Sequence, residues 1–344
     1  DRFLHNCMFD CQMEMERIIN FLLQGARDQG TENLGVLPIV GPANIGKSTL
    51  IEHACIDERA CNHFSQIVLL GGGDLIGKDM EALADGAGVI KHKNRAESGG
   101  GRVLIIVELD RDISEDFWRR FSSAVKNRFA SGSKIIVTSQ SDKIVRSGTT
   151  LPLRLQFLTQ EAYWYFFKVR TFGNVDTLAS VTMEMAREMS GCFMGATIFG
   201  GMLRSSFDIG TWSLALATYR EFRQRNRFIS CLNPVDPWAL SRPIFLPTVN
   251  RVSPGYFVIV KGYQTASANG DSAAPKFSVQ DVILGRARPQ GKFAALAWRS
   301  HVPPHYNYVF SCEQRIPVSA VSRKKLRRLL PCFVCIYVHM PPLN

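Results

Sequence analysis

The first part of the chain alternates between short apolar runs and segments with helical periodicity. The apolar runs, which we interpret as buried strands, are 34–40, 66–70, 103–107 and 134–139. Helical patterns cover residues 13–24, Lys47 to Asp57 and 114–129, and residues 91–101 form a polar, glycine-rich segment predicted to be a loop. Apolar strands that alternate with helices predict a parallel sheet covered by helices on both faces.

Two changes of pattern divide the rest of the chain. Residues 159–225 are helical in pattern, with short breaks, and predict a small helical domain. After residue 226 come prolines and then short β-type runs, "YFVIVKGY", "KFSVQDVIL", "KFAALAWRS" and "YNYVFSC", separated by turn-forming residues. We therefore predict three parts: an α/β domain over 1–158, a helical domain over 159–225, and a β-containing region over 226–344.

Charge follows the same division. Residues 1–225 carry 26 Lys and Arg against 26 Asp and Glu, whereas residues 226–344 carry 15 against 4, which accounts for the net charge of +11. Phosphate backbones and anionic lipids are the general partners of such a basic surface. Any contact with nucleic acid is therefore expected only through residues 226–344.

The cysteines and the apolar segments bear on the cellular compartment. The nine cysteines are scattered, which favours a reducing compartment over a disulfide framework. No secretory signal pattern is visible at the start, and the apolar run 329–340 is shorter than the roughly 20 residues that span a bilayer. We expect no transmembrane segment and a cytoplasmic location, with the nucleus as the alternative.

The stretch "GPANIGKS" (41–48) carries the main functional signal. It matches G-x-x-x-x-G-K-[ST] between a predicted strand and a predicted helix. The glycines let successive backbone N–H groups face a phosphate, Lys47 can reach the β- and γ-phosphates, and the Ser48 hydroxyl can ligate Mg²⁺. The residues predicted to hold an adenine nucleotide, ADP or ATP, are Gly41, Asn44, Ile45, Gly46, Lys47, Ser48 and Thr49.

An acid at the end of another strand commonly completes such a site. Glu108 directly follows the run 103–107, and Asp110 lies two residues further on, on the same side of an extended chain. We predict that Ser48 and Glu108 hold Mg²⁺, with Asp110 as the alternative acid. No separate catalytic base is evident, so the chain is expected to be at most a weak ATPase.

Several motifs resemble, in order, the NB-ARC module of plant disease-resistance proteins, a family of signal-transducing P-loop ATPases. They are "GPANIGKSTLIEHA", "VLIIVELDRDISEDFWRRF", "GSKIIVTSQSDKI", "LQFLTQEAYWYFFKVRTFG" and "MSGCFMGATIFGGMLR", and the resemblance runs from roughly residue 9 to residue 225. It implies a P-loop NTPase fold and a switch in which ADP holds the protein off, ATP turns it on, and other immune-signalling proteins are partners.

The chain also departs from the family pattern. The paired acids read Glu108-Leu109, the arginine that senses the γ-phosphate is replaced by Gln140, and the Gly-Leu-Pro-Leu motif reads as residues 192–195, "CFMG". Glutamine cannot place a positive charge on phosphate oxygens. No Met-His-Asp motif, winged-helix pattern or leucine-rich repeat is recognisable. The sequence thus favours a protein that holds ADP with weak or no hydrolysis.

Other interpretations stay open at this level. The chain could be an active P-loop ATPase, or residues 226–344 could bind nucleic acid or protein through basic residues, including the run 323–328, "RKKLRR". Cys332 and Cys335, with His301 and His305, have spacings that zinc sites permit, although apolar packing and loop exposure explain them better.

Overall fold

The computed structural model describes most of the chain, with gaps. The described residues are 11–24, 34–43, 45–71, 90–93, 101–110, 112–172, 179–189, 191–205, 208–227, 243–249, 256–266, 275–300 and 305–315. Asn44, His301, the basic run 323–328 and the pair Cys332 and Cys335 lie outside them.

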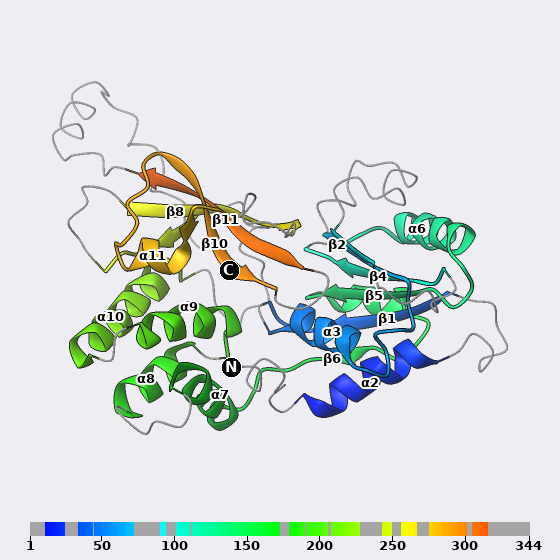
Figure 1. Cartoon of the computed structure of the whole chain (residues 1–344), viewed down its shortest axis with the longest axis horizontal. Helices are drawn as coiled ribbons and strands as arrows, with labels where there is room; N and C mark the ends of the chain where they lie inside the picture. Colours follow the sequence, from blue (N-terminus) through cyan, green and yellow to red (C-terminus); the bar gives the residue numbers. More distant parts are fainter. Residues whose placement is uncertain are drawn as a thin grey trace, which may run out of the picture.

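A six-stranded sheet, here called the P-loop sheet, forms the first part of the molecule (Figure 1, right). Its strands are β1 (Gly35–Val40), β2 (Gln66–Gly71), β3 (Ile90–Lys93), β4 (Val103–Glu108), β5 (Lys134–Ser139) and β6 (Leu153–Arg154). Their order is β3-β2-β4-β5-β1-β6, and all neighbours are parallel except β3, which pairs antiparallel with β2. The predicted parallel sheet is confirmed.

Helices cover both faces of this sheet because alternate strand residues point to opposite sides. The helices are α2 (Gln12–Leu23), α3 (Lys47–Ile56) and α6 (Glu115–Arg128). On one face, α2 and α3 pack on Leu37, Ile39, Leu104 and Ile106; on the other, Phe121 and Val125 of α6 pack on Val36, Ile105, Val107 and Val137. Consecutive residues of one strand therefore belong to different cores, as an internal strand of a two-sided sheet requires.

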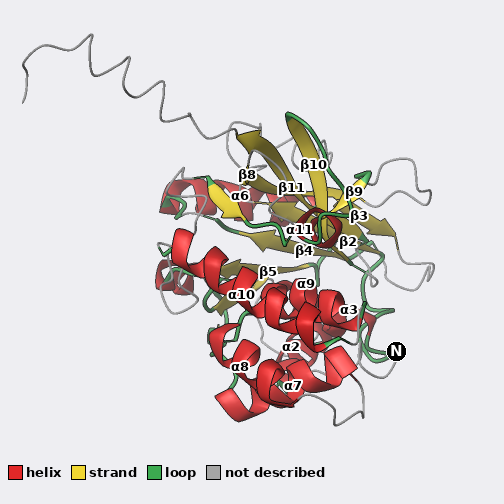
Figure 2. Cartoon of the chain, turned by 90° about the vertical axis from the view of Figure 1, so that its left-hand side faces the viewer, coloured by secondary structure: helices red, strands yellow, loops and turns green. Residues whose placement is uncertain are grey.

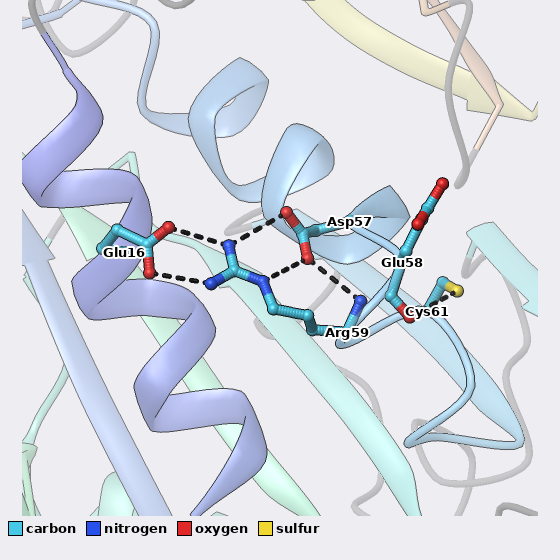
Figure 3. Close-up of polar contacts among 5 residues, drawn as sticks. All are labelled: Glu16, Asp57, Glu58, Arg59 and Cys61. Atoms are coloured by element: carbon cyan, nitrogen blue, oxygen red, sulfur yellow. Dashed lines mark hydrogen bonds and ion pairs between the residues drawn. The ribbon is translucent and has the colours of Figure 1, made fainter.

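Arg59 ties the chain after α3 to helix α2 (Figure 3). Its guanidinium donates to both carboxylate oxygens of Glu16, at 3.0 and 2.8 Å, and through Nε to Asp57 Oδ1 at 2.9 Å. The bond to Arg59 lowers the pKa of the Glu16 carboxyl. The three side chains are partly exposed, so this network fixes the relative position of α2 and α3 rather than contributing much stability.

Two strands of the P-loop sheet differ from the sequence prediction. Residues 91–93 were expected in a loop but belong to β3, which lies at the edge of the sheet beside β2. The two-residue strand β6 was not predicted; it pairs with Ile39 and Val40. Each of these two strands is extended because it forms backbone hydrogen bonds with a neighbouring strand. Neither has an apolar pattern from which a strand could be predicted.

Four helices, here called the helical unit, follow the P-loop sheet. They are α7 (Gln160–Phe172), α8 (Ala179–Met189), α9 (Phe193–Arg204) and α10 (Ile209–Arg225). The helical pattern predicted for this part of the chain is confirmed. Trp212, which has no exposed surface, packs against the ring of Phe172 at a centroid distance of 4.7 Å.

A second, five-stranded sheet, here called the C-terminal sheet, lies above the helical unit in Figures 1 and 2. It comprises β7 (Ile244–Leu246), β8 (Tyr256–Ala266), β9 (Phe277–Ser278), β10 (Lys292–Arg299) and β11 (Tyr306–Arg315), in the order β7-β8-β11-β10-β9. The predicted β content is confirmed, with one correction. Most of the run "KFSVQDVIL" is the short helix α11 (Val279–Ile283), whose N-cap Ser278 accepts a hydrogen bond from the Asp281 backbone.

One buried cluster joins the helical unit to the C-terminal sheet. Its members come from α7, α8, α9, α10, α11 and strands β7, β8, β10 and β11, and include Phe167, Phe199, Trp212, Tyr219, Leu246, Phe257, Ile259, Val282 and Phe310. The division at residue 225 stays a prediction, and this shared core means that neither side of it buries its apolar face alone.

The C-terminal sheet also reaches the P-loop sheet. Tyr306, at the start of β11, is 2% exposed and belongs to the core formed by α2, α3 and the P-loop sheet, with Trp298 of β10 packed beside it. Figure 1 shows β10 running towards that sheet and β11 running back from it. The last described strands are thus part of the environment of the phosphate loop.

We expect the shared core to make the helices depend on the C-terminal sheet. Phe257→Ala, at a side chain of β8 that is 5% exposed, should cost about 3–5 kcal/mol, as removal of a buried phenylalanine does. Thermal unfolding followed by helical circular dichroism should shift to lower temperature. Tyr263→Ala, on the same strand at 36% exposure, is the control and should cost less than about 1 kcal/mol. An unchanged helical transition in Phe257→Ala would show that the two parts unfold independently.

Candidate nucleotide site

The phosphate loop, residues 41–48, connects β1 to α3. Gly46 has φ 90° and caps the helix, so a left-handed backbone conformation turns the chain into α3. The backbone of this turn and the N-terminus of α3 present N–H groups that can bind an anion. The motif therefore has the strand, turn and helix that phosphate binding requires.

Gly41 is held at a close approach to the chain after β6. A Cβ atom at this position would lie 3.0 Å from the Leu155 carbonyl oxygen and 3.1 Å from Leu155 Cβ. The Leu155 backbone N–H donates to the Val40 carbonyl at 2.8 Å, which fixes this contact. A side chain at residue 41 would therefore displace the start of the loop.

Lys47 begins α3 and its ammonium lies over its own loop. Nζ donates to the carbonyl oxygens of Gly41 at 2.8 Å and Pro42 at 2.7 Å. Burial lowers the pKa of Lys47 to about 8, and the nearby Glu108 carboxylate opposes this by favouring the charged form. A phosphate would add negative charge here and would favour the charged form further.

The other predicted loop residues lie where the sequence places them, apart from Asn44, which is outside the described residues. Ile45 is buried in the core under the loop, and Ser48 and Thr49 are half-buried in the first turn of α3. Their roles towards a nucleotide and Mg²⁺ stay predictions.

The two predicted acids differ in their surroundings. Glu108 ends β4, in register with Thr138 of β5, and its side chain is half-buried near Lys47. Its Oε2 accepts a hydrogen bond from Gln264 Nε2 of β8 at 2.9 Å, while its Oε1 is buried without a partner among the described residues. Asp110 is exposed at the surface. Of the two, only Glu108 combines burial with proximity to Lys47.

Glu52 is a second acid at this site that the sequence interpretation missed. It lies on α3 at 3% exposure, in a run of six buried residues, and its Oε2 accepts from Ser300 Oγ at 2.8 Å. Burial raises the pKa of Glu52 to about 8, although the Tyr306 and Ser300 hydroxyls favour the carboxylate. A charged residue in a largely apolar helix segment was the available signal.

The positions that depart from the family pattern lie at the same edge. Gln140 follows β5, and its Oε1 is buried without a partner among the described residues. Phe193 begins α9 and packs beside the loop, since a Cβ on Gly46 would lie 3.6 Å from its ring. The ring of Phe166 meets Phe193 edge-on at 4.8 Å, and Tyr163 Oη donates to the Cys192 carbonyl at 2.8 Å. The helical unit therefore contacts the phosphate loop through an aromatic side chain.

The residues present fit a nucleotide with Mg²⁺. The turn at Gly46 and the ammonium of Lys47 suit phosphate oxygens, and hydroxyl and carboxylate oxygens are the protein ligands that Mg²⁺ takes in such sites. The orphaned Oε1 of Glu108 is a buried acceptor that a cation would satisfy. Ser48 and Glu108 would hold the metal, which would neutralise phosphate charge when bound.

Two other features are absent from the described residues. No group of three or more His, Cys, Asp or Glu side chains there could hold a metal ion, and no helix there is both long and apolar enough to cross a membrane. His305, the described member of the candidate zinc set, precedes β11.

The chain is similar in sequence to plant disease resistance proteins, although no family model matches it. Disease resistance protein RGA2 of Solanum bulbocastanum is 26% identical over 208 residues, which cover 55% of this chain and 21% of that protein. Putative disease resistance protein RGA1 of the same species is 24% identical over 217 residues, which cover 58% of this chain and 22% of that protein. This chain spans about a fifth of the length of these relatives, which are of the NB-ARC type.

Solved structures with a related arrangement include C. elegans PCH-2 and domain III of the Thermotoga maritima replication initiation protein DnaA. The first has a TM-score of 0.44 and 13% identity and covers 64% of this chain and 72% of its own. The second has a TM-score of 0.43 and 11% identity, with 63% and 95% covered. Because both scores are below 0.5, the fold assignment depends on the strand order and the phosphate loop described above.

Glu52 should make stability depend on pH. Its folded pKa lies above the ordinary value of 4.5, so its stabilising contribution is complete below that value and is lost as pH rises through about 8. Over this window the slope due to Glu52 should approach about 1.4 kcal/mol per pH unit. Chemical denaturation from pH 5 to about 8 should show a flatter profile for Glu52→Gln, whereas Glu58→Gln, at an exposed position, should follow the wild type. Parallel profiles for all three proteins would contradict the assignment.

Proposed function

From the similarity to NB-ARC-type resistance proteins, we propose that this chain is a regulatory module that binds an adenine nucleotide with Mg²⁺ and signals by exchange of ADP for ATP. The observation that carries the proposal is the phosphate loop, with Gly46 in the left-handed conformation and Lys47 lying over it at the start of α3. The likeness to the resistance proteins supports the same assignment.

We further propose that ADP is held more tightly than ATP and that hydrolysis is weak or absent. Gln140 stands where the resemblance places an arginine that senses the γ-phosphate, and an amide offers no positive charge to that group. The sequence offers no separate base to orient an attacking water, and the amide of Gln140 is not basic.

Partners and location belong to this proposal as well. Other immune-signalling proteins are the partners that a switch of this type would address, in the cytoplasm or alternatively the nucleus. A nucleic-acid role for residues 226–344 has less support, because Phe257 and Tyr306 are buried and Trp298 and Tyr308 pack against buried cores. Side chains in those positions are not free to stack on bases.

Purified protein should carry ADP, or bind ADP more tightly than ATP. The reason is an intact phosphate loop combined with Gln140 at the expected sensor position. Denaturation of the protein and chromatography of the released nucleotide test this directly, and competition between ADP and ATP for the emptied protein gives the preference. Predominant ATP, or a higher affinity for ATP, would contradict it.

Lys47→Ala and Lys47→Arg should each weaken ADP binding by roughly 10- to 100-fold, the range for loss of a hydrogen bond to a charged group. Arginine's planar fork does not replace the ammonium within this loop. Isothermal titration measures the affinity, and Lys126→Ala, at an exposed position on α6, is the control that should bind as the wild type does. Unchanged affinity in both Lys47 variants, with intact circular dichroism, would remove the loop as the site.

A further inference from the structure

Resting on the proposed function, we infer that Gln264 of the C-terminal sheet is a positioning residue of the nucleotide and Mg²⁺ site. It holds the Glu108 carboxylate through one oxygen and leaves the other for the metal. Residues 226–344, which lie beyond the part of the chain that resembles the NB-ARC module, thereby contribute to Mg²⁺-dependent nucleotide binding.

The contact itself is specific. Gln264 Nε2 donates to Glu108 Oε2 at 2.9 Å, across 156 residues of sequence. Glu108 Oε1 is buried and has no partner among the described residues. A buried carboxylate oxygen without a partner is costly, and a bound cation removes that cost. The bond from Gln264 thus fixes the orientation of the Glu108 carboxylate. In this orientation Oε2 is hydrogen-bonded, whereas Oε1 still lacks a partner among the described residues.

The backbone at Gln264 is held in place by its pairing with β11. In the ladder between β8 and β11, Gln264 stands opposite Tyr308, two residues after Tyr306. Tyr306 is buried in the core of the P-loop sheet, and Ser300, next to the end of β10, donates to Glu52 of α3 at 2.8 Å. The C-terminal sheet is therefore anchored to α3 independently of the bond to Glu108. Because of this anchoring, the position of the Gln264 amide does not depend on a flexible segment.

A neutral amide suits this position chemically. Lys47 is a cation that lies near Glu108, and the negative charge of Glu108 acts on Glu52, a second acid nearby. A carboxylate at residue 264 would add like charge, whereas the amide donates a hydrogen bond without drawing Glu108 away from a metal as a salt bridge would. The resemblance expects two consecutive acids here, and this chain has Glu108 followed by Leu109. Gln264 fixes the one acid that is present.

Gln264 should affect the part of the ADP affinity that depends on Mg²⁺, and not the part that the phosphate loop provides without the metal. The test uses the full chain and measures ADP affinity by isothermal titration, once with Mg²⁺ and once with EDTA. Gln264→Met keeps the length of the side chain and removes the donor. We expect the gain in affinity from Mg²⁺ to fall roughly 10- to 100-fold, the usual effect of losing a partner that orients a metal ligand, with ADP binding in EDTA unchanged.

The matched control is Gln280→Met. Gln280 of α11 also belongs to residues 226–344, and its Nε2 donates to the Thr197 carbonyl at 3.2 Å, in the helical unit. This variant should keep the Mg²⁺ effect of the wild type. Gln264→Ala tests the same point with a smaller side chain, should Gln264→Met not fold.

The outcomes separate the two proposals. An undiminished Mg²⁺ effect in the folded Gln264 variants would overturn the role of Gln264 while Lys47→Ala still tests the phosphate loop. An equal loss with Mg²⁺ and with EDTA, or an equal loss in the Gln280 variant, would also overturn it, because the effect would then be one of packing. A wild-type protein that binds no nucleotide would remove the proposed function, and the role of Gln264 with it.

Discussion

Polar groups buried at the carboxyl edge of the P-loop sheet set the main constraint on this molecule. Parallel strands all end at one edge, so Glu108 of β4 and the loop after β1 lie close together there, and α3 adds Glu52. Carboxylates buried at such an edge require partners. The C-terminal sheet supplies a partner for one oxygen of each carboxyl group, through Gln264 for Glu108 and Ser300 for Glu52.

Apolar packing adds a second reason why the three parts of the chain are not independent bodies. The helical unit contacts the phosphate loop through Phe193, and it shares one buried cluster with the C-terminal sheet. The C-terminal sheet in turn packs Tyr306 into the core below α3. Each part is thus in contact with both others, and the candidate nucleotide site lies where the three meet.

Local chemistry explains what could be predicted from the sequence. Runs such as 103–107 are apolar throughout because both faces of β4 are covered, and the phosphate loop is recognisable because its glycines satisfy local backbone demands. The features that could not be predicted from the sequence share a different cause. Strands β3 and β6 exist through pairing with a neighbour, and α11 is a single capped turn within a β-type pattern. The sequence around Gln264 does not indicate its role, because that role arises from a contact with a residue 156 positions away.

That separation also has a consequence for the order in which the molecule is made. At about 5–20 residues per second, synthesis of the 156 residues between Glu108 and Gln264 takes on the order of 10–30 s. During this interval β1, α3 and β4 have already been synthesised, whereas Gln264 and Ser300 have not. The bonds that Gln264 and Ser300 donate to Glu108 and Glu52 are therefore among the last contacts at this edge that can form, after the phosphate loop and α3 have been synthesised.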